Sequence, residues 1–537
     1  MTREAMDEGR RGDIEHVTLP RLVRAAAERH GNRPAIVDGD DVLSFARLAG
    51  EVKRATRSLM AAGVARGDRV ALWAPNGWRW IVAALAAHSA GAALVPINTR
   101  FKGEEAAYVL AKSGARVLFA TTDFLGADAL AMLEACAMPL PALETTVVLA
   151  GPAPSHALAW DQFLAGADAV PADAAEARAL AVEPGDVCDV MFTSGTTGRP
   201  KGATSTHAQT LRAFRDWADI VGLRAGDRYL VALPFFHSFG YKAGWLACLM
   251  LGATSYPLAV FDVSAVLERV ERHAITVLPG PPSLYQSILG REDLASRKLG
   301  SLRLAVTGAA VIPTGLVARM QRELGFDTVL TGYGLTEANG VSTLCRVGDD
   351  PETIASTSGR AIPGVEVRVV DDAGEEVPRG SPGEVVISGY TVTPGFFDDE
   401  HATAEALDAA GRLRTGDIGV MDEHGNLRIT DRKKDMFIVG GFNAYPAEIE
   451  SVLLRHESIA QVAVVGAPDE RLGEVGVAFV VPRAGALVEE PAVVAWSRER
   501  MANYKVPRRV LVVDALPMNA TGKVLKYALR DKLRVTK

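Results

Sequence analysis

The 537-residue sequence lacks the signals of several common classes of protein. Its four cysteines, Cys136, Cys188, Cys248 and Cys345, are widely scattered and form no Cys-x-x-Cys pair. Neither a zinc ribbon nor a disulfide framework is therefore indicated, and a reducing cytoplasm is the expected compartment. A net charge of −7 argues against broad electrostatic contact with nucleic acid. Small molecules are the expected partners.

Long apolar runs are also missing. The longest, residues 80–97, is interrupted by His88, Gly91 and Pro96, so we expect a buried helix and then a strand, not a membrane span. Residues 1–17 carry mixed charges and no apolar core, which is not the pattern of a signal peptide. We expect this N-terminus to be frayed.

Two catalytic motifs are absent. No Gly-x-Ser-x-Gly elbow indicates a serine hydrolase, and no Gly-Lys is followed by Ser or Thr, as a Walker A loop requires. A loop of another design is present at residues 193–202, which read Thr-Ser-Gly-Thr-Thr-Gly-Arg-Pro-Lys-Gly after the apolar run 190–192. Its hydroxyls, glycine backbone and cation suit a polyphosphate, and ATP is the expected nucleotide. The candidate ligands are Thr193, Ser194, Gly195, Thr196, Thr197 and Lys201.

The pattern of helices and strands predicts an α/β protein of two domains. Helical periodicity at 22–30 and 48–62 alternates with strand-like runs at 69–73 and 93–97, which is typical of a largely parallel sheet covered by helices. Five consecutive charges at 431–435 indicate a domain boundary. We therefore expect a first domain at 18–432 and a smaller α+β domain at 433–537.

Further motifs carry chemistry at the ends of expected strands. Small residues at Gly308, Ala309 and Ala310 would let a flat ring approach the backbone, and so would Gly332 and Gly334 around Tyr333. Beyond them, Thr336 can donate to a phosphate and Glu337 can hold Mg²⁺. Asp417 can accept the ribose hydroxyls. His237 lies among aromatic residues that could flank a carboxylate.

Taken together from about residue 20 to residue 530, these motifs resemble the adenylate-forming superfamily, which comprises acyl-CoA ligases, peptide-synthetase adenylation domains and luciferases. The resemblance implies a large N-terminal domain of layered parallel sheets and helices with a small β-barrel-like part, followed by a mobile α+β domain. It assigns the nucleotide to the loop at 193–202, the adenine to Tyr333 and Mg²⁺ to Glu337 with Thr193.

The same resemblance assigns roles nearer the C-terminus. Arg432 would reach the nucleotide, and Lys434 would be the hinge. Lys523 would bridge the carboxylate and the α-phosphate during adenylation. After rotation of the last domain, Gly440 and Gly441 would leave room for the pantetheine arm of CoA. The implied enzyme is an AMP-forming acyl-CoA ligase, with Lys523, Glu337, Thr336 and His237 as the catalytic residues.

Other classes of protein remain open. Residues 261–264, Phe-Asp-Val-Ser, resemble an amine-binding segment of peptide-synthetase adenylation domains, although Asp262 also suits the N-cap of a helix at 263–273. No carrier domain is expected after Lys523, and no insertion typical of fatty-acyl-AMP ligases lies between Lys434 and Gly441. A luciferase-like oxidoreductase is not excluded, whereas intact Glu337 and Lys523 disfavour an inactive nucleotide-binding regulator.

The candidate acid pocket comprises Phe236, His237, Tyr241, Trp245, Pro281 and Ser283. Tyr241 and Trp245, four apart on an expected helix, would either narrow a channel or pack in the core. Lys242 could meet a keto oxygen, but a solvent-facing position is favoured.

The segments 239–244, 278–287 and 334–340 resemble the actinobacterial ligases of steroid ring degradation. This implies a bicyclic acid, the methylhexahydroindanedione propanoate left from rings C and D. Medium- or long-chain fatty acids are the alternative. A monomer or homodimer is expected.

Overall fold

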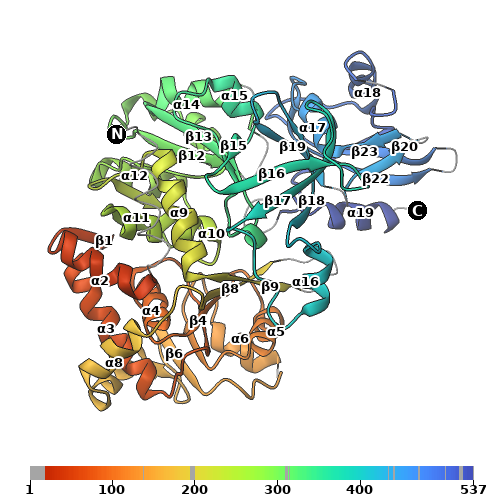
Figure 1. Cartoon of the computed structure of the whole chain (residues 1–537). Coiled ribbons are helices and arrows are strands. Elements are labelled where there is room, and N and C mark those ends of the chain that lie inside the picture. The colour runs from red at the N-terminus through yellow and green to blue at the C-terminus, as the bar shows by residue number, and fades with distance from the viewer. Residues whose placement is uncertain are drawn as a thin grey trace, which may run out of the picture.

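In the computed structural model the described part of the chain forms four β-sheets with helices around them (Figure 1). The residues that the structure describes are 18–136, 138–193, 200–308, 312–313, 315–432, 435–439, 442–469, 472–501, 503–518 and 524–535. Among them, no helix combines the length and the apolar character that a membrane crossing needs.

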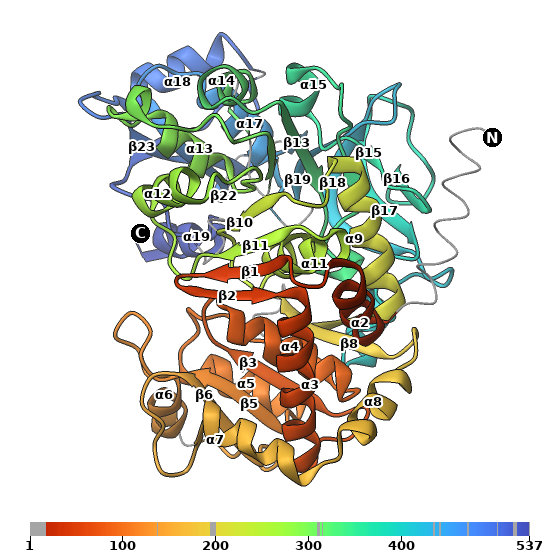
Figure 2. The ribbon, with the colours of Figure 1, turned by 90° about the vertical axis from the view of Figure 1, so that its left-hand side faces the viewer.

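The first sheet has seven strands in the order β7-β6-β5-β3-β4-β8-β9, all parallel except β9. Helices lie on both of its faces (Figure 2). The strands are β3 (Arg69–Trp73), β4 (Ala93–Pro96), β5 (Val117–Thr121), β6 (Thr145–Ala150), β7 (Leu158–Ala159), β8 (Val187–Thr193) and β9 (Lys201–Thr206). The helices are α3 (Phe45–Ala61), α4 (Trp78–Ser89), α5 (Gly103–Ser113), α6 (Ala129–Cys136), α7 (Trp160–Ala165) and α8 (Ala172–Leu180).

Alternation along β3 explains why helices cover both faces. Val70 and Leu72 pack in one apolar cluster with α3 and α4, whereas Ala71 and Trp73 pack in a second cluster with α5 and α6. A parallel strand buried on both faces is apolar throughout. The expected helix and strand within residues 80–97 are confirmed as α4 and β4, and neither is exposed to solvent.

A second sheet is assembled from two four-stranded pieces, β10-β11-β1-β2 and β12-β13-β14-β15. Val277 joins them, because it pairs in parallel with Tyr229 on one side and Leu304 on the other. The apolar run 275–278 favours a strand from the sequence, but Val277 alone forms bridges there. The strands are β1 (Pro34–Asp38), β2 (Asp41–Ser44), β10 (Arg228–Val231), β11 (Thr254–Pro257), β12 (Leu304–Gly308), β13 (Thr328–Tyr333), β14 (Thr343–Leu344) and β15 (Arg360–Ala361).

The helices around this sheet are α2 (Leu19–His30), α9 (His207–Val221), α10 (Ser238–Gly240), α11 (Ala247–Leu251), α12 (Val263–His273), α13 (Pro282–Leu289), α14 (Leu316–Leu324) and α15 (Pro351–Ser356). A π-helical turn, η2 (Tyr241–Leu246), joins α10 to α11, and a 3₁₀ turn, η4 (Thr336–Ala338), follows β13.

The small antiparallel part of the N-terminal region is a four-stranded sheet of consecutive strands. It consists of β16 (Val365–Val370), β17 (Pro382–Gly389), β18 (Leu413–Met421) and β19 (Leu427–Arg432), with α16 (Glu400–Ala406) between β17 and β18.

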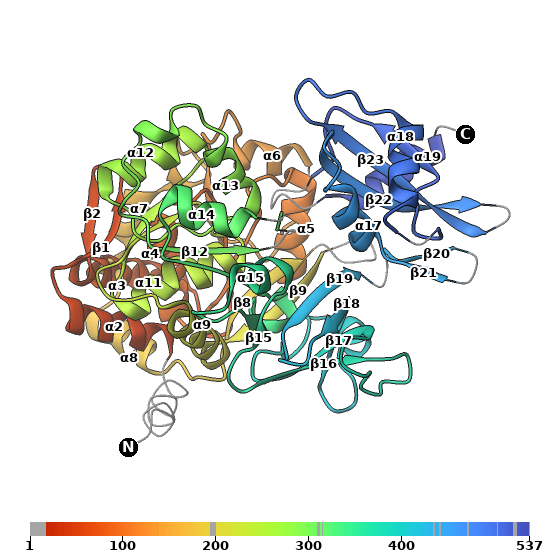
Figure 3. The ribbon, with the colours of Figure 1, turned by 90° about the horizontal axis from the view of Figure 1, so that it is seen from above.

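The C-terminal part has its own sheet, β21-β20-β23-β22, with β24 paired to β23, and its own apolar clusters. Figure 3 shows these elements beside β18 and β19. They are β20 (Phe437–Val439), β21 (Phe442–Ala444), β22 (Ile459–Asp469), β23 (Gly473–Pro482), β24 (Arg509–Val512), α17 (Pro446–Leu453), α18 (Glu490–Arg498) and α19 (Lys526–Val535). The domain boundary at 432/433 stays a prediction, because residues 433 and 434 lie outside the described chain.

Candidate active site

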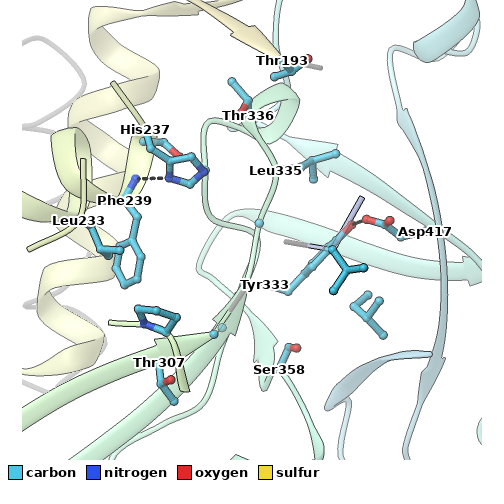
Figure 4. A pocket seen from close by; sticks show the side chains of 18 of the residues that line it. Thr193, Leu233, His237, Phe239, Thr307, Tyr333, Leu335, Thr336, Ser358 and Asp417 are labelled. Carbon is cyan, nitrogen blue, oxygen red and sulfur yellow. Dashed lines mark hydrogen bonds between the residues drawn. The ribbon is translucent and has the colours of Figure 1, made fainter. Parts of the chain in front are cut away.

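One pocket brings together the described residues that the sequence motifs indicate (Figure 4). It forms where β8, β12 and β13 end, as expected for ligands of an open α/β sheet. Gly308 of β12 pairs with Gly332 of β13, so two of the small residues are neighbours there. The predicted residues that line the pocket are Thr193, Lys201, His237, Gly308, Gly332, Tyr333, Gly334, Thr336, Glu337 and Asp417.

Tyr333 and Asp417 meet across the pocket. The Tyr333 hydroxyl donates a 2.6 Å hydrogen bond to Asp417 Oδ2, and Asp417 is buried on β18. A ribose bound to this carboxylate would therefore also meet the phenol. Arg432 pairs with Asp417 in the β18–β19 ladder, although nothing is described of its side chain.

The glycines on either side of Tyr333 have a packing role. A Cβ atom at Gly332 would lie 2.6 Å from Leu344 Cδ2 and 2.7 Å from the Thr343 carbonyl oxygen, and one at Gly334 would overlap the Gly340 backbone. Larger residues would push β13 away from β14, so these two glycines keep Tyr333 in place as well as leaving space for a ring.

Thr193 and Glu337 form the part of the pocket that suits Mg²⁺. The Thr193 hydroxyl donates to Glu337 Oε1 at 3.1 Å, and the Glu337 carbonyl accepts from Thr393 N at 2.8 Å. Oxygen ligands of this kind fit a hard cation. In the described chain no group of three or more His, Cys, Asp or Glu side chains is arranged to hold a metal ion by itself, so phosphate or water oxygens would have to complete the coordination.

Lys201 lies at the start of β9 and is paired with Thr193 in the β8–β9 ladder. Its Nζ is 3.4 Å from Glu405 Oε2 and 5.7 Å above the Phe396 ring. The long flexible side chain can exchange the half-exposed Glu405 for a phosphate, because such exposed ion pairs contribute little.

His237 presents a neutral imidazole to the pocket. Burial lowers its pKa, and its Nδ1 accepts from Phe239 N at 3.3 Å, which caps α10. The ring lines the pocket together with Phe236, Pro281 and Ser283, as predicted. It is therefore suited to orienting an acid, not to binding it as a cation.

Tyr241 and Trp245 do not line the pocket and belong to the core, so the channel interpretation is wrong for them. Their rings stack with centroids 5.0 Å apart, and Trp245 packs edge-on against Trp80 of α4. Both side chains are almost fully buried. Ala243 lines the pocket between them, because η2 points its larger side chains toward α4.

Lys242 contradicts both interpretations of the sequence. It faces neither solvent nor the pocket, and its exposed fraction is 1%. Its Nζ forms an ion pair with the fully buried Asp189, 3.0 Å from Oδ2, and it also donates to Ser205 and Asn339. A lysine can enter the core when all its donors are used.

Some pocket residues were not predicted. Thr307 precedes Gly308, and its buried hydroxyl has no partner among the described residues, so it is available to a ligand. Its place at a strand end could have identified it. Ser358 also lines the pocket, but only the tertiary structure brings it there. Glu384 holds the turn before Asp417 by accepting from Arg414 at 2.6 Å.

The remaining predicted residues lie outside the described chain. They are Ser194, Gly195, Thr196, Thr197, Ala309, Ala310, Lys434, Gly440, Gly441 and Lys523. Their roles stay predictions.

The sequence matches two known protein families. Residues 23–397 match the family of AMP-binding enzymes, and residues 448–523 match the AMP-binding enzyme C-terminal domain. The two matches follow each other along the chain in the order of the two regions described above.

Two curated relatives are similar over almost their whole length. A 3-[(3aS,4S,7aS)-7a-methyl-1,5-dioxo-octahydro-1H-inden-4-yl]propanoyl:CoA ligase from Mycobacterium tuberculosis is 52% identical over 514 residues, which cover 96% of this chain and 97% of that protein. A ligase of the same name from Rhodococcus jostii is 48% identical, covering 96% and 98%. Among solved structures, an anthranilate CoA ligase in complex with anthranoyl-AMP is 27% identical, with a TM-score of 0.87 over 97% of this chain and 98% of that chain.

Proposed function

The chain belongs to the family of AMP-binding enzymes and is an AMP-forming acyl-CoA ligase, and we propose that its acid is the bicyclic 7a-methyl-1,5-dioxo-octahydroindenyl propanoate. The observation that carries the proposal is the near full-length identity of 52% to a ligase named for that acid.

The composition of the pocket supports a compact acid with a few polar groups. Phe236, Pro281 and Leu284 supply apolar surface, and Ser283 and Thr307 supply hydroxyls. A ligand pocket of this kind is mostly apolar with a small number of placed polar groups. Hydroxyl donors of this type suit keto oxygens, which accept hydrogen bonds and cannot donate them.

For the first half-reaction we propose attack of the acid's carboxylate on the α-phosphate of ATP, with release of pyrophosphate. The carboxylate is already ionised near neutral pH, so catalysis consists of positioning and charge neutralisation. Mg²⁺, when bound, supplies positive charge at the phosphates. Glu337 and Thr193 would hold it, Lys201 and Lys523 would contact phosphate oxygens, and Asp417 would hold the ribose.

For the second half-reaction we propose that the thiol of CoA attacks the acyl-adenylate and AMP leaves. The region around Gly440 and Gly441 would admit the pantetheine arm after the last domain turns about Lys434. CoA is a better-supported acceptor than the carrier protein of a peptide synthetase. Asp262, the acid of the rival amine-binding segment, is exposed and caps α12 by accepting from Ala265 N at 2.8 Å.

We propose the cytoplasm as the compartment and a monomer or homodimer as the working form. All four cysteines lie in the described chain and are free thiols, which suits a reducing environment.

The test is CoA-dependent AMP release with Mg-ATP, in which the indanedione propanoate is compared with straight-chain acids of increasing length. We expect a strong preference for the bicycle. Glu337→Gln is the control, because AMP release by a contaminating ligase would survive it. A preference for fatty acids would overturn the proposed acid and favour the alternative of a fatty acid-CoA ligase. AMP release that needs no CoA would overturn the acceptor.

A further inference from the structure

A buried polar cluster lies behind the pocket and is not used by any of the roles above. We call it the ammonium cluster; it comprises Lys242, Asp189, Ser205 and Asn339. Lys242 Nζ lies 3.1 Å from Asp189 Oδ1, 3.1 Å from Ser205 Oγ and 2.5 Å from Asn339 Oδ1. These three partners use all three N–H donors of the ammonium group.

The first two partners lie at the base of the phosphate loop. Asp189 on β8 and Ser205 on β9 are paired residues of the antiparallel ladder. The same two strands end and begin at Thr193 and Lys201, on either side of residues 194–199. Lys242 therefore ties together the two strands from which the loop emerges.

The third partner follows the turn that carries Glu337. Asn339 has a left-handed backbone, with φ 56°, and its N–H donates to the Thr336 carbonyl at 3.0 Å. Its side-chain oxygen accepts from Lys242. Because the turn η4 is only three residues long, fixing Asn339 also fixes Thr336 and Glu337.

Two links therefore hold β8 against the Thr336–Glu337 turn. One lies in the pocket, where the Thr193 hydroxyl donates to Glu337. The other is the ammonium cluster, four residues earlier on the same strand face. The pocket link can be displaced by phosphate and Mg²⁺, whereas the buried link cannot exchange with water. The buried link therefore joins β8 and β9 to the turn independently of the nucleotide.

We propose that Lys242 is a positioning residue for Mg-ATP: through Asp189 and Asn339 it holds Thr193, at the end of β8, and the Thr336–Glu337 turn at the spacing that a Mg²⁺-bound triphosphate requires. Lys242 does not line the pocket, so it touches neither nucleotide nor acid. The inference rests on the proposed function for the roles of Glu337 and Thr193.

The experiment uses variants that remove the link without leaving a charge unpaired. Asn339→Gly keeps the Lys242–Asp189 ion pair and tolerates the left-handed backbone at this position, so it removes the side-chain contact to the turn without adding backbone strain. The double variant Asp189→Asn/Lys242→Met removes both charges together, because removing one partner of a buried pair is strongly destabilising. The Kd of ATP is measured calorimetrically with and without Mg²⁺, in the absence of acid and CoA.

The expected result is that Mg²⁺ tightens ATP binding in the wild type and that both variants lose about tenfold to a hundredfold of this tightening, the usual effect of removing a partner that orients a metal ligand. The rate of the adenylation half-reaction falls together with the affinity for Mg-ATP. The rate of thioester formation from supplied acyl-adenylate and CoA stays within about threefold of the wild-type rate. This half-reaction involves no triphosphate, so the spacing that Lys242 maintains is not needed for it.

The matched control is Asp227→Asn/Arg303→Met. Arg303 donates to the buried Asp227 at 2.8 Å and precedes β12 at the strand end away from the pocket. Asp227 is buried and Arg303 is largely buried, so the loss of this ion pair reports the effect of general destabilisation. We expect its two half-reactions to change together and its Kd for Mg-ATP to stay the same.

Unchanged Mg-ATP binding in Asn339→Gly, or an equal loss of both half-reactions in that variant, would overturn the proposal and leave Lys242 a structural residue. A different result would overturn the proposed function: a wild-type enzyme that makes no acyl-CoA from any of the acids. ATP binding would still test the role of Lys242 in that case, since it needs no acid.

Discussion

The segment 235–246 has two faces that differ in what they contact. Phe236, His237 and Ala243 line the pocket, whereas Tyr241 and Trp245 face away from it and pack against α4. Both faces are dominated by aromatic and small residues, so composition does not distinguish them. The pocket wall is therefore only one turn of helix thick here. The face that carries Ala243 meets the ligand, and the face that carries Tyr241 and Trp245 anchors the turn η2 in the core.

The inner face of the segment, formed by Tyr241 and Trp245, lies next to two buried histidines. The ring of His88 stacks on Tyr241, and the ring of His207 meets that of His88 edge-on. Because both histidines are neutral, the stability of this region is sensitive to acid. Burial lowers the pKa of His88 to about 3 and that of His207 to about 4, and the neighbouring His207 and Lys242 lower the pKa of His88 further. Unfolded histidine has a pKa of about 6.5, so the unfolded chain binds more protons below that pH.

The largest expected effect is therefore a pH-dependent loss of stability. The free energy of unfolding should be fully present above pH 6.5 and fall as the pH drops toward 4, with a slope approaching about 1.4 kcal/mol per pH unit for each histidine. Urea midpoints at pH 7, 6 and 5 would measure it. Constant midpoints over this range, where few carboxylates titrate, would contradict neutral buried histidines.

Trp245→Ala should be the most damaging single substitution on the inner face. Removing a fully buried indole costs about 3–5 kcal/mol, and Trp245 also supports Tyr241 and Trp80. Thermal unfolding would measure the loss. The ratio of kcat/KM values for the bicyclic and straight-chain acids should stay the same at a temperature where the variant is folded; a changed ratio would restore Trp245 as a pocket residue.

Ala243→Leu should change the acid kinetics, which Trp245→Ala leaves unchanged, because the side chain of Ala243 lines the pocket. The added bulk should cost roughly 1–3 kcal/mol of acid binding, which lowers kcat/KM for the bicyclic acid by about fivefold to a hundredfold and leaves the Kd of Mg-ATP unchanged. Ala247→Leu is the matched control, since Ala247 is buried four residues later and does not line the pocket. Equal effects of the two changes on acid kinetics would refute the two-face description.

The smallest effect is expected for Tyr241→Phe. The hydroxyl lies 3.3 Å from His88 Nε2, and losing one such hydrogen bond costs about 1 kcal/mol. Chemical unfolding would detect the change. Acid and ATP kinetics should match the wild type; a large loss of activity with normal stability would show that this hydroxyl reaches the reaction.

Much of the fold could be predicted because its signals are local. The alternation of residues along β3 and the apolar run that forms α4 and β4 are determined by the periodicity of burial. Asp262 was predictable as a helix cap for the same reason. At 275–278 the local signal was misleading: the apolar run predicts a strand, but only Val277 forms bridges, because pairing depends on neighbours that are distant in sequence.

The site divides in the same way. By itself, the sequence determined the nucleotide motifs, their order and the ligase family, because Gly332, Tyr333, Thr336 and Glu337 act within one short stretch. Only the tertiary structure decided which face of η2 meets the acid and where Lys242 points. Its partners lie 53, 37 and 97 residues away along the chain. A buried ammonium group is stable only where such distant segments bring enough acceptors together. The local sequence around Lys242 does not indicate which distant segments these are.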